Sequence, residues 1–249
     1  MTTDNGGNNT ASQTWALKVQ GLTKSFGNLL ALRGIDLEVR NGESLVIFGP
    51  NGAGKTTLIK VLATIMNPSS GRVLIDGLDL KKCAQQICRR IGVVAHLTFL
   101  YSNLTAYENL KFYSHMYDVP DARERIQEVA SLLGITSHLY DRVSILSRGM
   151  QQRLSLARAL LHKPAIMLLD EPETGLDQQA TSLLWKALKA EGGGKVTIIL
   201  TSHNLERGLE ICDQVAILAQ GKIAFMRPKQ DLNLADLKEA YQHSTRGEA

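Results

Sequence analysis

The stretch SLVIFGPNGAGKTTLIK, residues 44 to 60, decides the fold of this 249-residue chain. Its first five residues form a near-continuous apolar run, which is typical of a buried strand. A glycine-rich loop follows, and TTLIKVLATIM, residues 56 to 66, then has the pattern of a helix that ends before Asn67 and Pro68. A strand, a loop and a helix in this order predict an α/β protein.

The loop in this stretch fits the pattern G-x-x-x-x-G-K-[ST] in full. Glycines let the backbone curl so that successive N–H groups point at phosphate oxygens, and the following helix presents its positive end to the same group. Lys55 adds a charge for the outer phosphates, and the Thr56 hydroxyl is suited to coordinate Mg²⁺. The sequence therefore predicts a nucleoside triphosphate site formed by Gly49, Pro50, Asn51, Gly52, Ala53, Gly54, Lys55, Thr56 and Thr57.

Two other apolar runs end in polar side chains that are suited to phosphate hydrolysis. AIMLLDEP ends in Asp170 and Glu171, and VTIILTSH ends in His203. Asp170 would hold Mg²⁺ directly or through water, and Glu171 would accept the proton of an attacking water as the γ-phosphoryl group departs. His203 would reach the γ-phosphate by one hydrogen bond. Acidic pairs and single histidines are also common in loops, but the phosphate loop favours the functional interpretation.

A second anion site is predicted where SILSRGMQQRLSLARALL, residues 144 to 161, begins a helix. The Ser147 hydroxyl and the backbone N–H groups of residues 148 to 150 would form a helix tip that binds phosphate. One nucleotide cannot easily use both tips of a single chain, because they begin different helices in different lobes. Two copies facing head to tail could do so, and ATP would then join the dimer while its cleavage would loosen it.

Strands and helices alternate along the chain except in one helical block, from about residue 105 to residue 162. The block begins with Thr105-x-x-Glu108, a capping box that predicts the start of a helix. The interruption indicates an inserted helical subdomain. Helices are predicted at residues 79–90, 105–119, 121–133, 149–162 and 178–190, and strands at residues 91–95, 165–170 and 196–201.

Composition and charge narrow the functional class. The chain is 44% hydrophobic, carries a net charge of +4, has three cysteines without paired spacing, and contains no apolar run long enough to span a bilayer. Its basic residues are scattered without an accompanying aromatic stripe, so no nucleic-acid partner is expected. Residues 1–14 are polar and lack the regions of a signal peptide, and we expect a disordered tail there.

Over residues 15–227 the sequence resembles the ATP-binding cassette (ABC) ATPases, which are the motor subunits of ABC transporters. The resemblance implies an α/β fold of the P-loop NTPase class, with a RecA-like core sheet and an antiparallel β subdomain. It also implies an inserted helical subdomain at about residues 97–162 and a short C-terminal extension at residues 228–249. ATP would be the nucleotide and Mg²⁺ the metal ion.

The family motifs stand in family order. TKSFG supplies Phe26, which the resemblance makes the aromatic side chain that stacks on adenine. LSRGM, residues 146–150, matches the signature motif, and IMLLDE matches Walker B with Glu171 as the catalytic glutamate. TGLD, residues 174–177, matches the D-loop, so that Asp177 would contact the partner's site, and His203 matches the switch histidine.

Two motifs depart from the family pattern, at three positions. The signature motif usually reads Leu-Ser-Gly-Gly-Gln, and Arg148 and Met150 replace its third and fifth residues while Gly149 is kept. IGVVAH places His96 where the family has glutamine. A neutral imidazole is a poorer Mg²⁺ ligand than an amide oxygen. His96 is a candidate metal ligand beside Thr56 and Asp170 only through its place in the motif. The alternatives are coordination through water and a coupling loop that works differently.

AHLTFLYSNLTAYENLKFY together with LSRGMQQRLSLARALLHKP resembles the ATP-binding subunits of heme exporters in cytochrome c maturation. This resemblance implies integral-membrane partner subunits, a peripheral position on the cytoplasmic face of the plasma (inner) membrane, and a head-to-tail homodimer or heterodimer of ATPase subunits. The alternatives are an ABC transporter ATPase for another cargo, such as a drug, lipid or antibiotic, and a soluble ABC ATPase in iron–sulfur cluster assembly.

An apolar and aromatic segment follows His96 and gathers much of the scarce aromatic content. If partly exposed, it would form a groove for a short helix of a partner, and otherwise it would fill the core of the helical subdomain. We expect some of each, and we assign Met116, Tyr117 and Trp185 to the core. The segment includes Leu97, Phe99, Leu100, Tyr101, Leu104, Tyr107 and Leu110.

Overall fold

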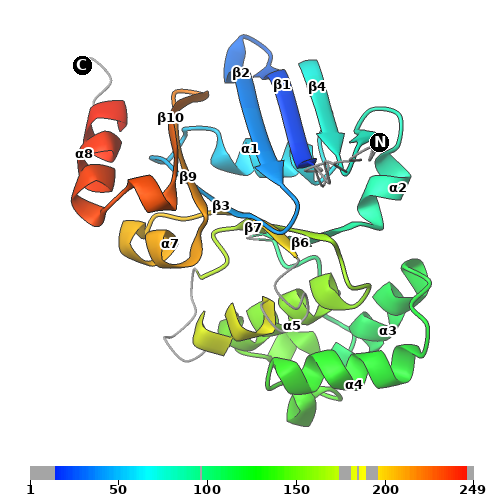
Figure 1. Cartoon of the computed structure of the whole chain (residues 1–249). Coiled ribbons are helices and arrows are strands. Elements are labelled where there is room, and N and C mark those ends of the chain that lie inside the picture. Colours follow the sequence, from blue (N-terminus) through cyan, green and yellow to red (C-terminus); the bar gives the residue numbers. More distant parts are fainter. Residues whose placement is uncertain (1–14, 96, 174–180, 184, 189–195, 246–249) are drawn as a thin grey trace, which may run out of the picture.

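The computed structural model describes residues 15–95, 97–173, 181–183, 185–188 and 196–245. A six-stranded sheet forms the centre, with the strand order β10-β9-β3-β8-β7-β6 (Figure 1). All neighbouring pairs are parallel except β10 and β9. The strands are β3 (Ser44–Phe48), β6 (Ile91–Val94), β7 (Ile166–Asp170), β8 (Thr197–Thr201), β9 (Gln214–Ala219) and β10 (Lys222–Pro228).

An antiparallel sheet lies over one face of the central sheet (Figure 1). Its strand order is β2-β1-β4-β5, and register shifts between β1 and β2 allow both strands to bend. With these shifts, both strands stay continuous over twelve residues each. The bounds are β1 (Trp15–Phe26), β2 (Leu29–Arg40), β4 (Ser70–Ile75) and β5 (Leu78–Asp79).

Helix α1 (Lys55–Leu62) packs between the two sheets. Leu58 and Leu62 are fully buried in one hydrophobic cluster with residues of both sheets. The prediction that this helix reaches residue 66 was wrong. Thr64 has a φ of 60°, a left-handed conformation that a right-handed helix cannot continue through.

Three helices form a block on the other face of the central sheet (Figure 1). They are α3 (Ala106–Met116), α4 (Ala122–Leu132) and α5 (Arg148–Leu160), and the short 3₁₀ turns Thr136–His138 and Val143–Ile145 lie between α4 and α5. The predicted capping box is confirmed, because Thr105 Oγ1 accepts the Glu108 N–H while the Glu108 carboxylate accepts the Thr105 N–H.

The alternating side chains of the central strands separate the two cores. In β3, Val46 and Phe48 join the cluster that contains the helical block, whereas Leu45 and Ile47 face the cluster around α1. Both faces of the strand are covered, and its sequence is therefore apolar at successive positions.

The remaining helices are shorter or lie near the C-terminus. Helix α2 (Ala84–Cys88) is shorter than the predicted 79–90 because Asp79 pairs with β4 instead. The described parts of the predicted helix at 178–190 are helical. Helices α7 (Leu205–Ile211) and α8 (Leu234–Thr245) pack against each other, with a 3₁₀ turn (Lys229–Asp231) before α8. No helix among the described residues is long and apolar enough to cross a bilayer.

A buried polar cluster joins the helical block to the edge strand β6. The His162 ring stacks on Tyr117 with centroids 4.0 Å apart, and its Nε2 lies 3.0 Å from the Ile91 carbonyl oxygen. Its Nδ1 is buried without a hydrogen-bond partner in the described structure. Burial lowers the pKa of His162 to about 4, and the cations Arg158 and Arg125 act in the same direction.

His162 makes the fold sensitive to acid. The unfolded chain takes up a proton at this site near its ordinary pKa of 6.5, whereas the folded chain resists protonation until about 4. From about pH 7 to about pH 4.5, the free energy of unfolding should therefore fall by about 2–3 kcal/mol through this group. Urea unfolding of His162→Phe should lack this part of the pH dependence. The exposed His115→Phe is the matched control, and an unchanged pH dependence in His162→Phe would contradict the assignment.

Candidate active site

The loop between β3 and α1 has a backbone that only glycine can adopt at two positions. A Cβ atom on Gly49 would lie 2.2 Å from the Leu218 carbonyl oxygen, and one on Gly54 would lie 2.8 Å from the Ala31 carbonyl oxygen. Gly54 is also the N-cap of α1, with a φ of 107°. Gly52 has a φ of 81° and is exposed at the turn. The loop thus curls at the positive end of a helix, as an anion-binding loop requires.

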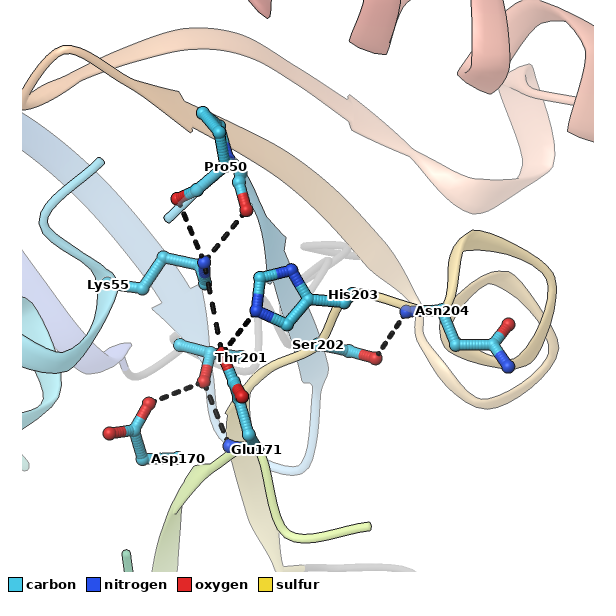
Figure 2. Close-up of polar contacts among 9 residues, drawn as sticks. Pro50, Lys55, Asp170, Glu171, Thr201, Ser202, His203 and Asn204 are labelled. Atoms are coloured by element: carbon cyan, nitrogen blue, oxygen red, sulfur yellow. Dashed lines mark hydrogen bonds and ion pairs between the residues drawn. The ribbon is translucent and has the colours of Figure 1, made fainter. Parts of the chain in front are cut away.

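Lys55 is buried under this loop, with an exposed fraction of 5%. Its Nζ donates to the carbonyl oxygens of Gly49, at 2.8 Å, and Pro50, at 3.1 Å (Figure 2). Burial lowers the pKa of Lys55, while the nearby carboxylates of Glu171 and Asp170 act against that shift. The ammonium group is thus held between the loop and the acidic strand end.

The other loop residues differ in exposure. Thr56, in the first turn of α1, is exposed, and so is Asn51, whereas Ala53 is buried against the cluster around α1. Thr57 and Pro50 are half-buried. The Thr56 hydroxyl is therefore accessible at the helix start.

Parallel pairing brings the predicted carboxylates beside strand β8. Asp170, which is 4% exposed, lies opposite Thr201 in the register of β7 and β8. Thr201 Oγ1 donates to Asp170 Oδ1 at 2.7 Å and accepts the Glu171 N–H at 3.0 Å (Figure 2). Thr201 was not among the predicted site residues. The available signal was a hydroxyl residue that ends an apolar strand two positions before His203.

Thr201→Val should reduce both stability and hydrolysis. Valine keeps the shape but leaves Asp170 Oδ1 and the Glu171 N–H without their partner, which costs about 1–3 kcal/mol. Thr201→Ser keeps the hydroxyl and is the matched control. The measurements are urea unfolding and the steady-state rate of ATP hydrolysis. Equal stability of the valine and serine variants would show that the bridge contributes nothing.

Glu171 is the point at which three parts of the site meet. Its Oε1 lies 2.5 Å from His203 Nε2 and 3.9 Å from Lys55 Nζ (Figure 2). Its backbone has a φ of 50°, a left-handed conformation that costs a non-glycine residue about 1 kcal/mol or more. A pocket of about 370 Å³ opens beside Glu171 and His203. Both side chains are partly exposed and can therefore meet a ligand.

The Ser147 tip opens α5 in the helical block. Ser147 is the N-cap, and its Oγ accepts the Met150 N–H at 3.3 Å. Ser147 is exposed, and a Cβ atom on Gly149 would meet nothing within 4 Å. Within the described residues, no hydrogen bond or ion pair joins residues 147–149 to the loop at residues 49–57. The tip is therefore open to another molecule.

The remaining predicted site residues lie apart or outside the described part of the chain. Phe26 ends β1 and is exposed, with Lys24 Nζ 5.2 Å from its ring centroid. His96 and Asp177 lie outside the described residues.

A strand, a glycine loop with a buried lysine, and carboxylates at the end of a neighbouring parallel strand together define a P-loop nucleotide hydrolase. Residues 32–174 match the family described as ABC transporter. The linearmycin resistance ATP-binding protein LnrL of Bacillus subtilis (strain 168) is 33% identical over 87% of this chain and 70% of its own length. The Nod factor export ATP-binding protein I of Cupriavidus metallidurans is 34% identical, over 87% and 73%.

A solved structure supports the same class. A dimeric ATP-binding cassette in a post-hydrolysis state, bound to ADP and phosphate, matches with a TM-score of 0.78 and 25% identity over 86% of this chain and 98% of its own. The chain belongs to the ABC transporter family. It is an ATP-binding subunit that hydrolyses ATP, and the predicted P-loop fold is confirmed.

Proposed function

We propose that this chain is the motor subunit of a membrane exporter and that two cassettes complete each other's active sites. The observation that carries the proposal is the separation of two anion sites in one chain. Lys55, which follows the loop after β3, lies near Glu171 and would hold one side of a triphosphate with it, while the Ser147 tip is exposed and open on the helical block. Head-to-tail pairing would bring the tip of one chain to the nucleotide of the other.

Each residue then has a specific role in hydrolysis. Lys55 would exchange its loop carbonyls for phosphate oxygens, because a charged partner binds an ammonium group more strongly than neutral carbonyls do. Glu171 would orient and deprotonate the attacking water. His203 would hold the Glu171 carboxylate and contact the γ-phosphate. Phe26 would stack on adenine, with Lys24 moving from its face.

The residues present fit Mg²⁺. The described residues contain no cluster of three or more histidine, cysteine or acidic ligands, but Mg²⁺ needs only one or two protein oxygens when phosphates supply the others. Thr56 and Asp170 would hold it, the first exposed and the second oriented by Thr201. When bound, Mg²⁺ neutralises charge on the β- and γ-phosphates. His96 remains a candidate ligand.

An exposed apolar face of the helical block suits a membrane partner. Leu97 is 65% exposed, and Phe99, Tyr101, Phe112 and Met116 are exposed too. Met116 was expected in the core, but it faces outward at the end of α3, whereas Trp185 is buried as expected. Leu110 is fully buried in the block, so the predicted segment divides between core and surface. We propose that integral-membrane subunits dock here, with the chain peripheral on the cytoplasmic face.

For the cargo, we propose a small organic molecule of the drug or antibiotic class. The name of the linearmycin resistance relative supports this class, and the name of the Nod factor relative supports export. Export of heme remains a prediction from the two segments that resemble heme exporters. Both interpretations need a membrane partner, whereas a soluble ATPase for iron–sulfur cluster assembly does not.

Capture from detergent-solubilised membranes of the native host tests this proposal. We expect the chain to recover a multi-span membrane protein, and recovery of soluble proteins alone would contradict a motor subunit. Leu97→Glu should abolish the recovery. Leu29→Glu, at an equally exposed leucine on β2, is the matched control and should not. In vesicles with the recovered partner, stimulation of ATP hydrolysis by heme but not by drug-class compounds would favour heme.

A further inference from the structure

We infer that Glu173 is a positioning residue for ATP hydrolysis. It joins the chain segment that carries Glu171 to the segment that carries His203. The inference rests on the roles proposed above for those two residues. Glu173 itself lies beyond the two strand ends that the family motifs identify, in the wall of the pocket beside Glu171 and His203.

One oxygen of Glu173 holds two side chains from different helices. Its Oε1 accepts Trp185 Nε1–H at 2.7 Å and Arg207 Nε–H at 3.1 Å. The ion pair is only partly exposed, with 21% for Glu173 and 30% for Arg207, so water screens it less than a surface pair. Trp185 is buried and cannot easily move. Glu173 is therefore anchored on one side and holds Arg207 on the other.

Three contacts connect residues 170–173 with residues 201–207. The first is the Thr201 hydroxyl, which joins Asp170 and the Glu171 backbone, and the second is the contact between His203 and Glu171 (Figure 2). The third is the ion pair between Glu173 and Arg207. The first and third lie on either side of the second, so together they restrain the distance between the proposed base and the histidine.

The local structure explains why the third contact is needed. Glu171 has a left-handed backbone, and the direction of its side chain depends on how the chain is held after it. Arg207 lies in the first turn of α7, whose N-cap Asn204 directly follows His203. A cation in a first helical turn is disfavoured by the helix dipole. The contact with Glu173 therefore accounts for an arginine at position 207, whereas the stability of α7 does not.

Steady-state kinetics of ATP hydrolysis test the inference. Glu173→Ala should lower kcat by about tenfold with KM for ATP changed less than about twofold, since binding groups are untouched. Arg207→Met should also lower kcat, and the double variant should be no slower than Glu173→Ala, because Glu173→Ala already removes the contact with Arg207. An unchanged kcat, a parallel rise in KM, or additive losses would each overturn the inference.

Two controls separate positioning from general damage. Glu206 lies on α7 like Arg207, and Glu206→Gln removes its exposed ion pair with Lys238 of α8; this variant should leave kcat unchanged. Glu173→Gln keeps the shape, and its amide oxygen can still accept both N–H groups. If this variant folds normally, its kcat reports the effect of removing the negative charge alone. Its kcat should lie between those of the parent and the alanine variant. A kcat equal to the parent's would contradict a role for the charge.

Tryptophan fluorescence reports the contact directly. The chain has two tryptophans, so Trp15→Phe leaves Trp185 as the only emitter. Adding Glu173→Ala to it should shift the Trp185 emission, and an unchanged spectrum would contradict the contact. Glu171→Gln in the same kinetic assay tests the proposed function separately. If Glu171→Gln is inactive while Glu173→Ala is fully active, only the present inference fails, whereas an active Glu171→Gln removes the proposed base.

Discussion

Glu171→Gln should reduce ATP hydrolysis by about 10³-fold while ATP binding stays intact. Glutamine has the shape of glutamate and can keep contact with His203, but it cannot accept the proton of the attacking water. The nucleotide would then persist between two chains and hold them together. Turnover measured by phosphate release and the mass of the complex in ATP, measured by light scattering, check the two parts of this prediction.

The control for this charge change is Glu206→Gln, on the exposed surface of α7. It should hydrolyse ATP at the normal rate and form no persistent dimer. If Glu171→Gln also turns over at the normal rate, another group removes the proton and Glu171 has been misassigned.

Ser147→Arg should reduce hydrolysis by about 10²-fold or more, because a long cation replaces the small N-cap hydroxyl at the exposed tip of α5. The loop that holds the nucleotide in the same chain is untouched, so the affinity of a dilute, monomeric sample for a fluorescent ATP analogue should not change. In the parent protein, specific activity should rise with protein concentration, since each site needs a second chain.

Ser131→Arg, at an exposed serine of α4, introduces the same charge elsewhere on the helical block. It should leave both activity and nucleotide affinity unchanged. Normal hydrolysis by Ser147→Arg, or a specific activity independent of concentration, would mean that each chain hydrolyses ATP alone.

The phosphate loop and its flanking elements could be predicted because they depend on local rules. The apolar run before Gly49 and the lysine after Gly54 define a strand, a turn and a helix start without reference to the remaining chain. Likewise, the capping box located the start of α3 because its two hydrogen bonds lie within four residues. Helix ends were less predictable. Thr64 adopts a left-handed conformation, and threonine is not a residue type that indicates one.

The supporting residues of the site could not be predicted for a different reason. Thr201 bridges two strands that are neighbours in the sheet but separated in sequence, and periodicity does not give strand order. Glu173 depends in the same way on how helix α7 and Trp185 come together. The assigned roles of the site residues and the domain boundaries at residues 15–227, 97–162 and 228–249 stay predictions, as does the disordered tail at residues 1–14.

The helical block enters the chain between β6 and β7, and β6 is the outermost strand of the central sheet. The chain therefore leaves the sheet after its edge strand and returns into the neighbouring strand, so the insertion interrupts no other strand pair. The arrangement is modular. A related chain could carry a block of other length or surface, and so fit another membrane protein, while the strands that support ATP cleavage keep their pairing.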